Sequence, residues 1–161
     1  MRNLNQVLLC LVTATALAAP LKLVDAQKVG GLKLGLDSSQ VTALLGKPAK
    51  EGKPVEEAAT GLTVKDQTYP QRGLVITLSR EGKATVWRLE RFTVTSPCQW
   101  KTPQGIGIGS SQQEVRKAYG ELLDKEGQSA TQLVVGSIYD GLIFHFKNGK
   151  VESIFVGAAA E

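Results

Sequence analysis

Two stretches of the chain repeat one pattern at a constant offset of 74 residues, and they decide the fold. The first is GLKLGLDSSQVTALLG (residues 31–46) and the second is GIGIGSSQQEVRKAYG (residues 105–120). Each begins with a short alternation that closes on a glycine. Each ends on a further glycine, Gly46 or Gly120, of the kind that supplies the left-handed residue after a helix. The repeat predicts one short helix in each copy.

The two predicted helices share a capping signature. Asp37 and Ser111 are N-cap residue types, whose side chains accept from the free N–H groups of the first helical turn. Gln40 and Glu114 stand three residues further on and complete a capping box. Helices of about two turns are unstable alone, so each must pack on a sheet. The stripes expected to be buried are Val41, Leu44 and Leu45 in the first helix and Val115, Ala118 and Tyr119 in the second.

The second half of each copy reads as antiparallel strands. The alternating segments 74–78 and 142–146 each precede a glycine-containing turn, at 81–82 and 148–149, that suits a hairpin. A further strand is expected before each hairpin, at 62–69 and 132–139. Residues 47–61 are polar and are expected to form an exposed loop.

The predicted fold class is therefore α+β, a tandem repeat of a short helix packed on an antiparallel sheet of three to four strands. We place the first α+β repeat at residues 27–98 and the second at 99–161. The two are expected to form one compact tandem unit.

The N-terminus has the pattern of a signal peptide, residues 1–26. A short positive start is followed by an apolar run, 7–19, that is too short to span a bilayer as a helix. Two small-residue cleavage sites follow: one cut after Ala26 and one before Ala19. We prefer the cut after Ala26, because a polar region then separates the apolar run from the cut.

No lipobox is present, because Leu9 precedes Cys10 and the apolar core has barely begun there. No later apolar run is long enough for a transmembrane segment. The sequence therefore predicts a secreted or periplasmic protein of the cell envelope or the extracellular space.

Composition argues against a nucleic-acid partner. The formal net charge is only +4, and the charges alternate along the chain instead of forming the basic stripe of a nucleic-acid binder. Once the signal peptide is removed, Cys98 is the one cysteine left, so an intrachain disulfide is excluded. A free cysteine is typically a buried small apolar residue.

Residues with catalytic chemistry are scarce. His145 is the one histidine of the chain, and it lies in the middle of a predicted strand. It cannot build a His-rich metal site. The sequence has no Gly-x-Ser-x-Gly elbow and no phosphate loop. We expect no enzyme, no catalytic residue, no metal and no cofactor.

Residues 102–120, together with Tyr139 and the later Phe-Lys-Asn-Gly-Lys-Val at 146–151, resemble a known group of small exported proteins. These have the β-lactamase-inhibitor-protein-like fold and include outer-membrane assembly proteins of the SmpA/OmlA (BamE-like) type. The resemblance covers residues 31–157. The chain differs from the assembly type because it has no lipobox and carries two copies. The two-copy form is closer to the inhibitor type, for which the resemblance implies binding of a protein through a concave sheet.

A helix-on-sheet unit leaves the other sheet face open. The expected function is a non-catalytic exported binding module that holds a protein partner on that face, in envelope assembly or in an inhibitor-like role. Two alternatives remain: a small-molecule or lipid carrier with an apolar cavity between sheet and helices, and an enzyme that uses His145. The candidate protein-binding residues are Tyr69, Val75, Thr77, Arg88, Trp100, Tyr139, Ile143 and His145.

Overall fold

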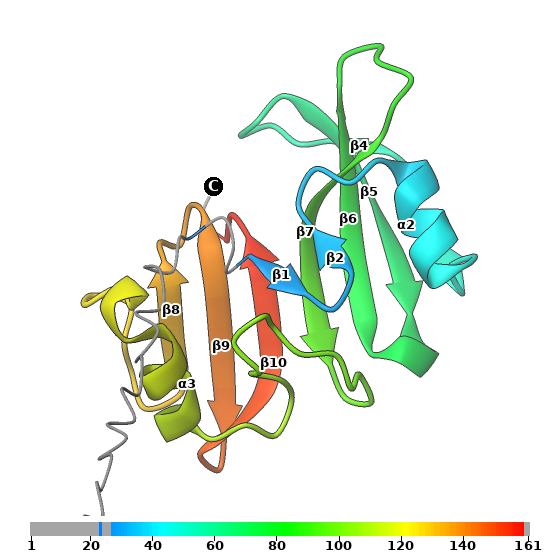
Figure 1. Cartoon of the computed structure of the whole chain (residues 1–161). Helices are drawn as coiled ribbons and strands as arrows, with labels where there is room; N and C mark the ends of the chain where they lie inside the picture. Colours follow the sequence, from blue (N-terminus) through cyan, green and yellow to red (C-terminus); the bar gives the residue numbers. More distant parts are fainter. Residues whose placement is uncertain (1–22, 24–26, 160–161) are drawn as a thin grey trace, which may run out of the picture.

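The computed structural model describes residues 23 and 27–159, and its main feature is a single broad antiparallel sheet (Figure 1). The predicted signal peptide, residues 1–26, lies outside the described residues except for Leu23. Among the described residues, no helix has the length and apolar character needed to cross a membrane.

Both predicted helices are confirmed, together with their caps. Helix α2 spans Ser38–Leu45 and helix α3 spans Gln112–Tyr119. The Asp37 carboxylate accepts from the backbone N–H groups of Ser39 and Gln40, each at 2.9 Å, and Ser111 Oγ accepts from the Glu114 N–H at 3.2 Å. The serine hydroxyl and the backbone N–H groups that donate to Asp37 hold the pKa of that carboxyl below its usual value. Both capping boxes are complete.

Eight strands form the sheet in the order β3-β5-β6-β7-β10-β9-β8, and β4 pairs with β5 beside β3. The strand bounds are β3 Lys50–Glu51, β4 Val55–Glu56, β5 Leu62–Tyr69, β6 Leu74–Glu81, β7 Arg88–Thr95, β8 Gln132–Gly136, β9 Gly141–Lys147 and β10 Lys150–Gly157. A separate hairpin consists of β1 (Lys28–Val29) and β2 (Leu32–Lys33), and short 3-10 turns follow β5 (η1, Pro70–Arg72) and α3 (η2, Gly120–Leu122).

This topology corrects the predicted fold class. The chain is mostly antiparallel sheet, and it is not a tandem repeat of a helix on a small three- to four-stranded sheet. The physical reason is the pairing of β7 with β10, in which Val94 lies opposite Ile154. Strand β7 is the outer strand of the first predicted sheet and β10 that of the second. Because these two strands pair, the two predicted sheets form one continuous sheet. The segment 47–61, expected to be a loop, also contributes β3 and β4 to the edge of β5.

One face of the sheet carries the helices and the β1–β2 hairpin (Figure 1). The core lies between these layers and is filled by side chains, so a ligand bound there would have to displace them. Val41 and Leu45 of α2 and Val115 and Tyr119 of α3 are buried. The Tyr119 ring packs on Phe144 with a centroid distance of 5.4 Å. Cys98 is a free thiol and is buried in the same core.

Two β-bulges determine which side chains face away from the helices. Glu90 is the extra residue of β7, since Leu89 pairs with Leu78 while Arg91 pairs with Thr77. Glu152 is the extra residue of β10. Each bulge shifts the alternation by one residue, so that Phe92 and Ile154 enter the core. The face opposite the helices is called the open face below.

Candidate functional site

A row of directly paired side chains crosses the open face. It runs over six neighbouring strands and consists of Thr68, Val75, Thr93, Phe155, Ile143 and Val134. Side chains opposite one another in an antiparallel pair lie on the same face and contact each other. The three steps from Val75 to Ile143 cover about 14 Å at the usual strand spacing. The pairing therefore joins apolar side chains from both halves of the chain into one surface.

A groove of about 370 Å³ lies over the second half of this row. We call it the open-face groove, and it is lined by Thr93, Gln132, Ile138, Ile143, His145, Ser153, Phe155 and Ala159. Ile143 and Phe155 are direct partners within the groove, and Ser153, His145 and Gln132 form the next row of paired residues. The groove thus combines apolar side chains with a row of hydrogen-bonding groups.

Two loops cover the outer part of this row, and the first of them belongs to the wall of the groove. The backbone N–H of Ala159 donates to the carbonyl oxygen of Ile138 at 2.7 Å, which joins the C-terminal segment to the β8–β9 turn. At Gly127 an added Cβ would lie 2.7 Å from a Val134 methyl carbon, so that loop packs directly on Val134. Val134 is consequently buried, whereas Phe155 is only partly covered.

The first half of the open face is polar instead. Thr77 Oγ1 donates to Asp66 at 2.7 Å, and Ser79 Oγ donates to Glu90 at 2.8 Å. Arg91 forms an ion pair of 2.8 Å with Glu57, and the side chains of both are at most a quarter exposed. These contacts satisfy the polar groups within the chain. The open face is therefore asymmetric, with a bonded polar half and an apolar half.

Four of the predicted binding residues lie on the open face. Val75 pairs with Thr93 and is 44% exposed. Thr77 is buried, and its hydroxyl donates a hydrogen bond to Asp66. Ile143 is nearly buried in the floor of the groove, and His145 is half-buried at its polar edge. The structure brings Ile143 and His145 together, and it links Val75 to them through Thr93 and Phe155.

Two other predicted residues, Tyr69 and Trp100, pack against the core. Tyr69 belongs to the core, where its hydroxyl donates to Gln67 at 2.9 Å and burial raises its pKa. Tyr69 pairs with Leu74, and this register places its ring on the helix side. Trp100 also packs against the core, over Gly30, where an added Cβ would collide with the indole ring.

The remaining two predicted residues lie apart from the groove. Arg88 begins β7, and its guanidinium donates to the carbonyl oxygen of Gly35 at 3.4 Å. Tyr139 is 68% exposed in the turn between β8 and β9. Neither lines the open-face groove.

Sequence reasoning missed Thr93 and Phe155, which join the two halves. If side chains alternated strictly from the buried Val151, Phe155 would point into the core. The bulge at Glu152 shifts the alternation by one residue, so Phe155 points to the open face instead. Two consecutive polar residues between apolar ones, here Glu152 and Ser153, are the signal that could have indicated the bulge, since β7 has the same arrangement at Glu90 and Arg91.

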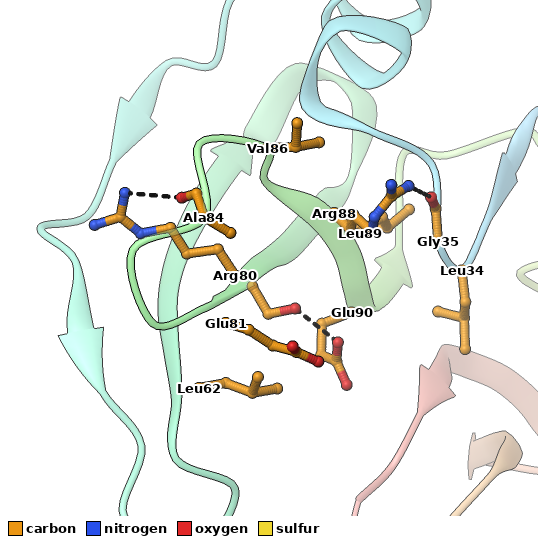
Figure 2. A pocket seen from close by; sticks show the side chains of 11 residues that line it. Leu34, Gly35, Leu62, Arg80, Glu81, Ala84, Val86, Arg88, Leu89 and Glu90 are labelled. Carbon is orange, nitrogen blue, oxygen red and sulfur yellow. Dashed lines mark hydrogen bonds between the residues drawn. The ribbon is translucent and has the colours of Figure 1, made fainter.

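A second hollow of about 480 Å³ lies at the β6–β7 hairpin (Figure 2). Arg80 donates to the carbonyl oxygen of Ala84 at 3.4 Å, Arg88 donates to Gly35, and Glu90 accepts from Ser79. With Glu81, the lining carries two positive and two negative side chains. The formal charges of the lining therefore sum to zero.

Among the described residues, no three His, Cys, Asp or Glu side chains gather as a metal site would require. Comparison with family models, with curated proteins and with solved structures finds no match to this chain. The geometry of the open face is therefore the basis for a functional assignment.

Proposed function

We propose that this chain is a non-catalytic, exported binding module that holds a protein partner on the open face of its sheet. The observation that carries the proposal is the row Val75–Thr93–Phe155–Ile143, in which Val75 is exposed, Phe155 is partly covered and Ile143 is buried in the floor of the groove. An exposed apolar surface with a polar border is typical of a protein–protein contact.

The dimensions of the open-face groove suit side chains of a partner. A volume of about 370 Å³ accommodates one or two large side chains. Aromatic and arginine residues supply most of the binding energy in protein interfaces when they fill such hollows. The hydroxyl and amide groups of Ser153 and Gln132 at the polar edge can bond the partner's backbone or a polar ring atom.

The asymmetry of the open face favours one partner that spans both halves. In the polar half, internal hydrogen bonds and an ion pair fix the positions of the side chains. This half can therefore form a polar border of the interface without rearranging. The apolar half offers the contact area. The resemblance to the inhibitor-type and BamE-like exported proteins supports the same kind of role, in the periplasm or outside the cell.

The test is to locate the binding surface of a captured partner. The exported protein is used as bait on an extract of the envelope of its host, and the retained protein is identified. Hydrogen–deuterium exchange of the purified complex then maps the contact. We expect protection of β9 and β10 around Ile143 and Phe155. Protection confined to α2 and α3 would contradict the proposal.

A further inference from the structure

A hollow of about 330 Å³ lies at the end of the sheet where α2 ends and the chain passes from β5 to β6 (Figure 1). Its floor contains the buried side chains of Leu45, the last residue of α2, and Tyr69, the last residue of β5. The residues of its rim are exposed: Lys47, Ala49, Pro70, Gln71 and Arg72. We call it the Lys47–Arg72 hollow.

Backbone contacts hold both segments of the rim in place. On one side, the backbone N–H of Ala49 donates to the carbonyl oxygen of Thr68 at 2.9 Å. On the other, Gly73 follows the rim with a φ of +63°, and its carbonyl oxygen accepts from the N–H of Thr95 at 2.8 Å. The rim therefore has a defined shape without a ligand.

Both charged side chains of the Lys47–Arg72 hollow are positive. Among the described residues, the lining includes no Asp or Glu. Within residues 27–159, neither Lys47 nor Arg72 forms an ion pair or a side-chain hydrogen bond. Each of the other arginines in this part of the chain donates to an oxygen atom: Arg80, Arg88, Arg91 and Arg116. The N–H donors of Arg72 are thus available to a ligand.

The charge of Glu51 reaches the floor of the hollow, but its carboxylate is already engaged. Burial raises the pKa of the Tyr69 hydroxyl, the charge of Glu51 raises it further, and the charge of Arg72 lowers it. The carboxylate of Glu51 accepts from Lys65 at 3.1 Å and from Gln67. The positive charge of Arg72 therefore acts on the floor of the hollow without a carboxylate bonded to it.

We propose that the Lys47–Arg72 hollow binds an organic oxyanion, a phosphate or carboxylate group carried on an apolar body. A guanidinium can bond such a group through two parallel N–H···O contacts, and the lysine adds a second positive charge. Leu45, Ala49 and Pro70 supply apolar surface for the body of the ligand. The volume lies at the lower end of the usual range for ligand pockets. This inference is independent of the proposed protein-binding function, since none of these residues lines the open-face groove.

A titration of the purified protein followed by two-dimensional NMR tests the inference. The probes are phenyl phosphate and benzoate, which join an oxyanion to an aromatic ring, and benzylamine, which has the same ring and a positive charge. At fixed ionic strength, we expect saturable shifts at Gln71 and Arg72 with at least one of the two oxyanions and none with benzylamine. The oxyanion that binds more tightly identifies the group as phosphate or carboxylate. The inference is overturned if neither oxyanion gives saturable shifts up to about 10 mM, or if benzylamine binds equally well.

Matched variants locate the site. Arg72→Gln should weaken binding of the preferred oxyanion at least about tenfold, because a charge-assisted hydrogen bond is lost, and Lys47→Gln should weaken it in the same direction. Arg88→Gln removes an arginine that is also exposed but lies outside the hollow, so it should bind like the wild type. All three variants should unfold close to the wild-type temperature, because the substituted side chains are exposed. Equal affinities of Arg72→Gln and Arg88→Gln would overturn the assignment of the hollow.

Discussion

Thr93 of β7 and Phe155 of β10 are direct cross-strand partners, and they lie where the two halves of the chain join. Their pairing makes one sheet from strands that belong to distant parts of the sequence. It also brings Val75, which pairs with Thr93, into the same row as Ile143, which pairs with Phe155. The join between the halves and the proposed binding surface are thus one feature of the fold.

A substitution at Gly73 tests how closely the chain packs at the start of β6. Gly73 has a φ of +63°, and an added Cβ would collide with the carbonyl oxygen of Thr95. We expect Gly73→Ala to lower the free energy of unfolding by about 3 kcal/mol or more, because both the backbone strain and the collision must be relieved. Gly61 has a φ of +68° with no atom within 4 Å, so Gly61→Ala should cost only ~1 kcal/mol. Chemical denaturation measures both, and equal losses would contradict the crowding at Gly73.

The ion pair between Glu57 and Arg91 should contribute more than an exposed pair. It is largely covered, whereas the side chains of Lys147 and Glu152, 3.3 Å apart, are more than half exposed. Glu57→Gln should lower the free energy of unfolding by about 1–2 kcal/mol, because the ion pair between Arg91 and Glu57 would be lost in a partly desolvated place. Glu152→Gln should cost less than ~0.5 kcal/mol. The prediction fails if the two variants unfold at the same denaturant concentration.

Tyr119 should make the protein sensitive to alkaline pH. Burial raises the pKa of its hydroxyl to about 12 from an ordinary value of 10.0. The folded state therefore keeps this proton where the unfolded state loses it, so the stabilising contribution is complete below pH 10 and is lost as the pH rises from 10 towards 12. The loss by pH 12 is on the order of 2 kcal/mol.

The variant Tyr119→Phe isolates this effect. The stability of the variant should fall less steeply between pH 10 and 12 than that of the wild type. At neutral pH the change should be within ~1 kcal/mol, because within the described residues the buried hydroxyl forms no hydrogen bond of normal geometry. Tyr139→Phe is the control, because Tyr139 is largely exposed. An alkaline profile of Tyr119→Phe identical to that of the wild type would refute the prediction.

Local signals in the sequence were sufficient for the helices and the hairpins. The capping boxes at Asp37 and Ser111 placed both helix starts correctly, because a cap depends on residues within one turn. The β6 and β9 strands also follow from local alternation. That alternation correctly placed Val75 and Ile143 away from the core cluster.

The pairing of β7 with β10 could not be predicted in this way. It joins segments about 60 residues apart, and nothing local encodes the register. The side-chain positions of the two candidate tyrosines were not encoded locally either, since Tyr69 is buried on the helix side while Tyr139 is exposed in a turn. The bulges at Glu90 and Glu152 reversed the alternation, which concealed Phe155 as a surface residue.

The most direct test of the binding surface is the affinity of the captured partner for two variants with the same substitution. Val75→Lys places a charge in the row that links the halves, and Val55→Lys places one at a similarly exposed valine on the sheet edge. Both should fold with wild-type Tm. Isothermal titration should show that Val75→Lys weakens binding at least about tenfold, a loss of ~1.4 kcal/mol or more, while Val55→Lys binds like the wild type. Equal affinity of the two variants, or a loss confined to Val55→Lys, would contradict the central claim that the partner binds on the open face.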